Sequence, residues 1–144
     1  MKSSFTYDIN LIGYMNTFKQ VTGVDAKDCF SLDGTLFFLT EKGKAGLAIG
    51  KEGKNILNLK KKLLKDVKIM EHSPEPSELA ANFIYPLKPT EIFVSDKDGK
   101  KILNIKFARP RERRFLLSQN QEKLKQLKIV MKRYNPEIED ILVL

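Results

Sequence analysis

The sequence predicts an α+β protein built from two related units, each with a three-stranded mixed sheet and helices packed on one face. The first observation is that the order helix, strand, strand, helix, loop, helix, strand can be read twice along the 144 residues. The second is an internal repeat, because a shift of 68 residues places Ile49 on Leu117. The third is a break at residues 73–77, which holds two prolines. We therefore expect two domains, over residues 1–75 and 76–144.

Hydrophobic periodicity, caps and turn residues predict the elements of the first unit. Asp8 is a suitable N-cap and Gly23 a suitable stop for the first helix, and Asp33-Gly34 is a strong hairpin signal. The predicted elements are a helix over 8–20, strands over 29–32 and 35–40, a helical turn over 44–49, a loop over 50–53, a helix over 54–65 and a strand over 66–72.

The same signals predict the second unit. Ser77 can cap its first helix, Asp98-Gly99 predicts a hairpin turn, and Pro110 suits the first turn of a helix. The predicted elements are a helix over 78–84, strands over 91–96 and 100–108, a helix over 110–117, a polar loop over 118–121, a helix over 122–134 and a strand over 138–144.

Charge is concentrated in two basic blocks. The net charge is +8, but residues 42–68 carry nine lysines against two acidic residues, and residues 97–133 carry thirteen Lys and Arg against three. The segment between them, residues 69–96, is acidic. Two lysine-rich, solvated helix faces would explain part of this pattern. Two phosphate-contacting surfaces explain it better, which points to a polyanionic partner.

Several classes of protein are excluded by composition and motif. No run of 18 apolar residues and no signal-like N-terminus occurs, so we expect a cytoplasmic protein without a membrane span. One cysteine, Cys29, and one histidine, His72, cannot make a Cys/His zinc site. A P-loop is excluded because Ala45 stands where its first glycine belongs and Glu52 where its hydroxyl belongs. We find no catalytic constellation and expect no enzyme activity, no metal and no cofactor.

The stretch GLAIGKEGKNI carries the chemistry. Gly50 and Gly53 lie between two predicted helices, and they allow a sharp turn and the close approach of a sugar-phosphate backbone. We expect the N–H groups of Lys54 and Asn55, at the start of the second helix, to point at that backbone. Lys51 and Lys54 can add charged contacts to phosphate. The loop therefore predicts a clamp for a nucleic-acid backbone.

This string resembles the I-G-K-x-G-x-N-[IV] signature of KH domains and is most similar to the first KH unit of NusA transcription factors. The order of elements, α-β-β-α-α-β, resembles the type II (prokaryotic) KH arrangement. A tandem of such units with nothing appended is similar to the short archaeal NusA-like proteins. The resemblance covers residues 8–144 and implies that single-stranded RNA is bound by Ile49, Gly50, Lys51, Glu52, Gly53, Lys54, Asn55 and Ile56.

The second unit departs from the KH pattern. Its loop reads SQNQ over residues 118–121, without either glycine, so we do not expect it to clamp phosphate in the usual way. The residues around that loop remain basic, and we expect the second unit to extend an electrostatic track for RNA. The residues that we assign to this track are Arg109, Arg111, Arg113, Arg114 and Lys123.

The resemblance also implies the biological role. It implies a monomer that acts in transcription elongation or termination by engaging nascent RNA near RNA polymerase. The alternative is a tandem KH protein in ribosome assembly or RNA processing, since type II KH units occur there too. Co-purification with RNA polymerase or with ribosomal particles separates the two roles.

Overall fold

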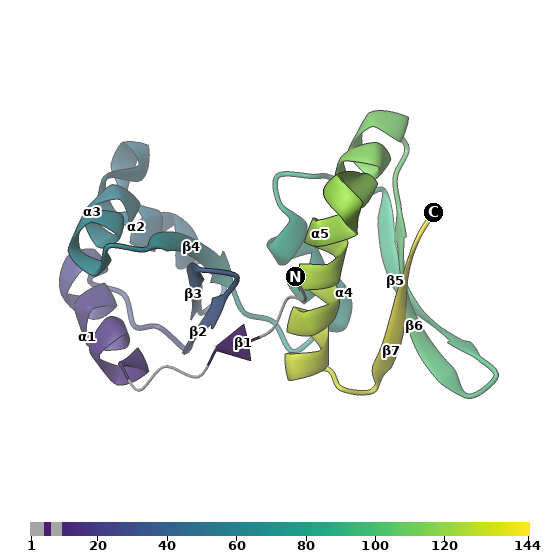
Figure 1. Cartoon of the computed structure of the whole chain (residues 1–144), viewed down its shortest axis with the longest axis horizontal. Coiled ribbons are helices and arrows are strands. Elements are labelled where there is room, and N and C mark those ends of the chain that lie inside the picture. The colour runs from purple at the N-terminus through teal and green to yellow at the C-terminus, as the bar shows by residue number, and fades with distance from the viewer. Residues whose placement is uncertain (1–4, 7–9) are drawn as a thin grey trace. The chain divides into compact units, whose positions relative to one another are not determined.

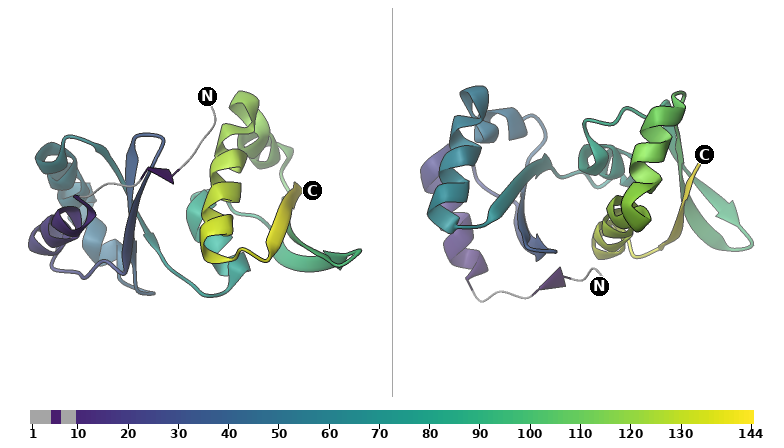
Figure 2. Two further views of the ribbon diagram at one scale, coloured as in Figure 1. Left: turned by 60° about the horizontal axis from the view of Figure 1, so that its bottom comes forward. Right: turned by 45° about the horizontal axis from the view of Figure 1, so that its top comes forward.

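The computed structural model describes residues 5–6 and 10–144 (Figure 1). The chain divides into two compact units, Met1–His72 and Ser73–Leu144. Both have α+β architecture, with helices on one side of a mixed sheet (Figures 1 and 2). Within the described residues, none of the helices has the length and hydrophobicity that crossing a membrane requires.

The first unit has a sheet in the order β1-β2-β3-β4, so the expected three strands are joined by a fourth. β2 and β3 form the antiparallel hairpin predicted at Asp33-Gly34, and β4 runs parallel to β3. β1 pairs with β2 through only two residues, which is too short for a sequence pattern. The elements are β1 (Phe5–Thr6), α1 (Leu11–Thr22), β2 (Asp28–Leu32), β3 (Thr35–Thr40), α2 (Ala45–Ile49), the 3₁₀ turn η1 (Lys51–Gly53), α3 (Lys54–Leu63) and β4 (Asp66–Glu71).

The core of the first unit lies between its helices and its sheet. Phe18 of α1 stacks on Phe38 of β3 with ring centroids 4.6 Å apart, and both side chains are fully buried. Ala48 of α2 and Leu59 of α3 belong to the same cluster. Both helices that border the GKEG loop are thus anchored on one core. α1 ends at Gly23 as predicted, whereas the proposed cap Asp8 lies outside the described residues.

The second unit has a sheet in the order β5-β6-β7, with β5 antiparallel and β7 parallel to β6. This is the predicted three-stranded mixed sheet. Its hairpin turns at Asp98 and Gly99, both with positive φ. The elements are α4 (Pro76–Ile84), β5 (Glu91–Lys97), β6 (Lys100–Lys106), α5 (Pro110–Tyr134) and β7 (Ile138–Val143).

The start of α4 differs from the prediction. The helix begins at Pro76, with Glu75 as its N-cap, so Ser77 lies inside the first turn and does not cap it. Proline suits a first helical turn because its missing N–H has no partner there anyway. The hydroxyl of Ser73 instead accepts a hydrogen bond from the backbone N–H of Glu75 (3.1 Å).

A small ion-pair arrangement occurs in both units. Lys60 of α3 pairs with Asp66 at the start of β4 (3.4 Å), and Lys128 of α5 pairs with Asp140 of β7 (3.2 Å). Each aspartate also accepts a hydrogen bond from the backbone N–H of the next residue. The N–H of Ile141, with help from Lys128, lowers the pKa of Asp140 against the opposing effect of partial burial. The 68-residue shift matches Lys60 with Lys128, whereas the two aspartates lie 74 residues apart, so only the lysine of each pair follows the repeat.

Candidate nucleic-acid interface

The GKEG loop forms a tight turn between α2 and α3. The N–H of Gly53 donates to the carbonyl of Gly50 (3.1 Å), and the N–H of Lys54 donates to the carbonyl of Lys51. The second contact corrects the prediction that the Lys54 N–H points at a bound backbone, because it is used inside the turn. The turn is thus fixed by its own backbone hydrogen bonds before any ligand binds.

Both the backbone conformation at position 50 and the side chain packed against it require glycine there. Its φ of 82° and ψ of 167° lie in a region that is essentially restricted to glycine. A Cβ at this position would lie 2.8 Å from the side-chain Cγ of Asn55. The amide of Asn55 lies against Gly50 and donates to the carbonyl of Leu47 (3.4 Å). The side chain of Asn55 thus joins α3 to α2, whereas its backbone N–H is the group predicted to face RNA.

Gly53 has a different role from Gly50. Its φ of 73° and ψ of 17° are left-handed helical values, which asparagine and aspartate also adopt. A Cβ here would be 3.6 Å from Cγ2 of Ile56, an ordinary contact. Packing therefore does not require glycine at position 53. Because Gly53 has no side chain, the backbone of the loop is left uncovered there. Bare backbone is what close approach of a sugar-phosphate chain requires.

Three charged side chains surround this bare surface. Lys51, Glu52 and Lys54 are all exposed. Ile49 and Ile56, which were predicted to contact RNA, are half-buried and pack against the core of the first unit. Only part of each isoleucine can therefore face a ligand. The loop offers two exposed lysines, one exposed carboxylate and the half-buried backbone of its two glycines.

The SQNQ loop keeps part of the shape of the GKEG loop without its glycines. Asn120 (φ 59°, ψ 29°) nearly repeats Glu52 (φ 56°, ψ 27°), and Gln121 (φ 60°, ψ 31°) takes the left-handed conformation of Gly53. The first residues differ, because Ser118 has a φ of −78°. The helical path of α5 is broken over residues 118–121, as predicted, and Gln121 carries a side chain where Gly53 has none.

Replacing Gln121 by glycine should stabilise the protein by about 0.5–1 kcal/mol. A left-handed conformation costs a non-glycine residue about 1–2 kcal/mol, and the greater flexibility of glycine in the unfolded chain offsets part of that gain. Urea unfolding of the native protein and of Gln121→Gly measures the difference. Asn120→Gly is the control, and it should change stability less because asparagine tolerates this conformation. A lower unfolding midpoint for Gln121→Gly would contradict the strain argument.

The predicted basic residues of the second unit fall into two groups. Arg109, Arg111, Arg113 and Arg114 are exposed in the cap and first turns of α5, as a phosphate track needs. Lys123 is half-buried, and its Nζ lies 4.4 Å from the centre of the Phe83 ring. Lys123 is thus held in a cation–π contact rather than extended into solvent.

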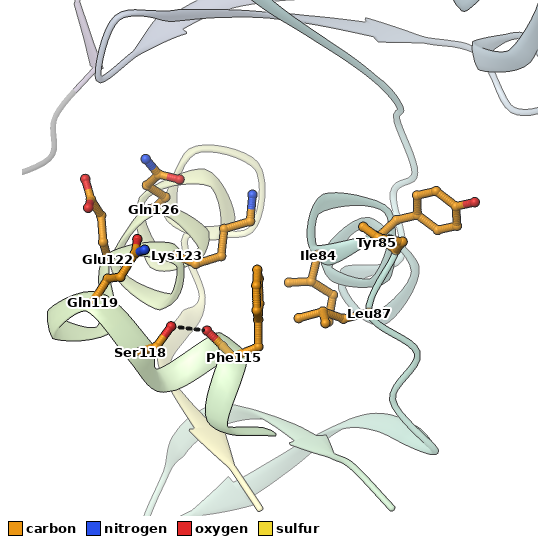
Figure 3. A pocket seen from close by; sticks show the side chains of 10 residues that line it. Ile84, Tyr85, Leu87, Phe115, Ser118, Gln119, Glu122, Lys123 and Gln126 are labelled. Atoms are coloured by element: carbon orange, nitrogen blue, oxygen red, sulfur yellow. Dashed lines mark hydrogen bonds between the residues drawn. The ribbon is translucent and has the colours of Figure 1, made fainter. Parts of the chain in front are cut away.

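The second unit contains a pocket that was not predicted. A pocket of about 510 Å³ lies between the end of α4 and the two halves of α5 (Figure 3). Phe115 projects into it and is 62% exposed. The pocket was not predictable from the sequence, because Phe115 stands in the apolar run Phe115-Leu116-Leu117, and periodicity does not settle which of these residues faces the core. No group of three or more potential metal ligands occurs among the residues that the structure describes.

The chain is similar in sequence to two archaeal proteins that are named as probable transcription termination proteins. No protein-family model matches it. It is 27% identical over 129 residues to the "Probable transcription termination protein NusA" of Methanocaldococcus jannaschii, covering 90% of this chain and 68% of that protein. It is 28% identical over 103 residues to the protein of the same name from Methanococcus vannielii, covering 72% of this chain and 59% of that protein.

A solved structure is also similar. The crystal structure of APE1850 matches 96% of this chain and 100% of its own chain, with a TM-score of 0.80 and 24% sequence identity. At that identity the likeness concerns the fold alone. The two sequence relatives confirm the resemblance predicted from the IGKEGKNI string: the chain is similar to archaeal proteins named as probable NusA.

Proposed function

We propose that this protein is a non-catalytic, single-stranded RNA-binding protein that acts in transcription termination or elongation. In this proposal residues 1–75 and 76–144 are two type II KH domains, and the first holds the RNA backbone with its GKEG loop. The observation that carries the proposal is the bare, left-handed Gly53 between the exposed lysines Lys51 and Lys54.

The chemistry of the loop favours a phosphate backbone as its ligand. Exposed ammonium groups bind phosphate oxygens through charge-assisted hydrogen bonds. An absent side chain lets the sugar-phosphate chain lie against the protein backbone, as in KH domains, where a GXXG loop clamps four nucleotides. The turn is already closed by its own hydrogen bonds, so binding need not order it.

The second domain is proposed to lengthen the binding surface. Its SQNQ loop carries Gln121 at the position of Gly53, and this side chain would hinder the close approach of a backbone. The exposed arginines at the start of α5, Arg109, Arg111, Arg113 and Arg114, supply phosphate contacts instead.

The role in transcription rests on the two relatives, which are named as probable transcription termination proteins. It implies RNA polymerase as a protein partner. The test is affinity purification of the tagged protein from its own cells, followed by mass spectrometry. Enrichment of RNA polymerase subunits supports the transcription role. Enrichment of ribosomal or RNA-processing particles without polymerase would contradict it and would favour the alternative KH role.

Glu52 gives a specific prediction about the GKEG loop. Its exposed carboxylate lies in the turn between Lys51 and Gly53, where it repels phosphate. Glu52→Gln should therefore strengthen binding of single-stranded RNA about two- to fivefold, the effect of removing a repulsion of about 0.5–1 kcal/mol in a solvated site. Fluorescence anisotropy with labelled RNA measures this gain. Glu139→Gln, an exposed acidic residue of β7, is the control and should change affinity less. An unchanged affinity in Glu52→Gln would place the RNA away from the loop.

A further inference from the structure

The pocket at the SQNQ loop has an exposed aromatic wall inside a basic segment. Phe115 stands in the middle of the pocket and faces the side chains of Ile84 and Leu87 (Figure 3). The hydroxyl of Ser118 donates to the carbonyl of Phe115 (2.8 Å), which secures the turn of α5 that carries the ring. An apolar pocket with an exposed aromatic wall can accept a planar ring system, and its volume is within the range of small-molecule sites.

The corresponding position of the first unit shows what is special about Phe115. The 68-residue shift matches Phe115 with Leu47, which is exposed to the same extent, at 63%. The pocket beside Leu47 is about 250 Å³, half as large, and most of its lining residues are charged. Both units thus expose an apolar residue here, but only the second has an aromatic ring and room to stack another ring against it.

We propose that this pocket binds a nucleobase of single-stranded RNA, stacked on Phe115. The proposal rests on the proposed RNA-binding function and names a second, base-contacting site for it. Unstacked bases of single-stranded RNA pack on exposed aromatic side chains, and every base has a face for such a contact. The two KH units would then divide the task, because the first holds the backbone and the second holds a base.

The charged side chains that line the pocket are Glu122 and Lys123, and the exposed arginines beside it make its surroundings basic. This favours nucleic acid over an apolar protein segment. Arg111 precedes Phe115 by one helical turn and therefore lies on the same side of α5. Arg114 is its direct neighbour, and both arginines are exposed. A base on the ring would place its phosphate within reach of these guanidinium groups, which bind phosphate through two parallel hydrogen bonds.

The polar rim suits the edge of a base. Gln119 lines the pocket on the side of α5, and its amide carries both donors and an acceptor (Figure 3). Lys123 also lines it, with its ammonium held over the Phe83 ring. The SQNQ loop lacks the glycines of the GKEG loop and therefore the proposed backbone clamp. In their place, it brings the amide of Gln119 to the proposed base-binding pocket.

Phe115→Ala tests this site in the full-length protein. Loss of one stacked base should weaken binding of labelled single-stranded RNA about tenfold. The slope of log affinity against log salt should stay unchanged, because no charge is removed. Phe115→Tyr should bind like the native protein. Phe93→Ala removes an exposed aromatic of the sheet in the same unit and serves as the matched control, with native affinity expected.

An abasic oligonucleotide of the same length separates stacking from phosphate binding. Native protein and Phe115→Ala should bind it equally, since it has phosphates but no bases. Native affinity of Phe115→Ala for RNA would overturn the proposal and would assign the pocket to a protein partner. An equal loss on RNA and abasic strand would also overturn it. If the native protein binds no RNA at all, the proposed function itself fails, which is a different result from either.

Discussion

Gly53→Asp should weaken the binding of single-stranded RNA about 10- to 100-fold and leave the fold intact. The backbone at Gly53 is left-handed, which aspartate tolerates, and its Cβ would make only an ordinary contact with Ile56. The new carboxylate would stand where phosphate is proposed to lie. Two like charges about 4 Å apart repel by about 1 kcal/mol in water and about 4 kcal/mol near a protein surface, and a 10- to 100-fold loss, about 1.4–2.8 kcal/mol, lies between these limits. Fluorescence anisotropy measures the affinity, and far-UV circular dichroism checks the fold.

Gly53→Asn is the matched control for this experiment. Asparagine has the size of aspartate and tolerates the same backbone conformation, but it carries no charge. It should lose less affinity than Gly53→Asp, and the difference reports repulsion of phosphate. Gly50→Asp is unsuitable, because a side chain there collides with Asn55 and would distort the loop. Equal, native-like affinity of both Gly53 variants would mean that RNA does not approach this loop.

Phe38→Ala should cost about 3–5 kcal/mol of folding free energy, the largest effect on stability expected from a single substitution here. Phe38 is fully buried in β3 and stacks on Phe18 of α1, so the change leaves a cavity between sheet and helices. The loss is comparable with the whole stability of a small domain. Chemical unfolding followed by circular dichroism measures it.

The exposed Phe93 of β5 provides the comparison for Phe38. Phe93→Ala removes the same number of atoms from a partly exposed position and should change the unfolding midpoint far less. Because α2 and α3 rest on the core around Phe38, Phe38→Ala should also lose RNA binding as the first unit unfolds. An unfolding midpoint close to that of the native protein would show that this core does not hold the unit together.

The order of helices and strands was predictable because the signals are local. Asp33-Gly34 and Asp98-Gly99 turn where expected, since both residues of each pair take the positive φ values that such hairpin turns require. Gly23 ends α1 with the left-handed conformation expected of a glycine cap. The break at residues 118–121 followed from polarity alone, although no glycine marks it.

Other features depend on contacts that a sequence does not display. β1 has only two residues, so no alternation reveals it. The choice between Glu75 and Ser77 as the cap of α4 depends on where Pro76 enters the helix. The contact of the Asn55 side chain with Gly50 was not predicted, because it depends on how α3 packs against α2. The exposure of Phe115 was not predicted, because which residue of an apolar run is exposed depends on how α4 and α5 pack.

The most direct test of phosphate binding by the GKEG loop is the salt dependence of RNA affinity for Lys51→Ala/Lys54→Ala beside the native protein. If both lysines contact phosphate, the slope of log affinity against log salt should fall by about 1.4, since each contact to a single strand contributes about 0.7. Lys61→Ala/Lys62→Ala removes two exposed lysines from the far end of α3 and should change the slope little. An identical slope for the native protein and the Lys51/Lys54 variant would contradict the clamp.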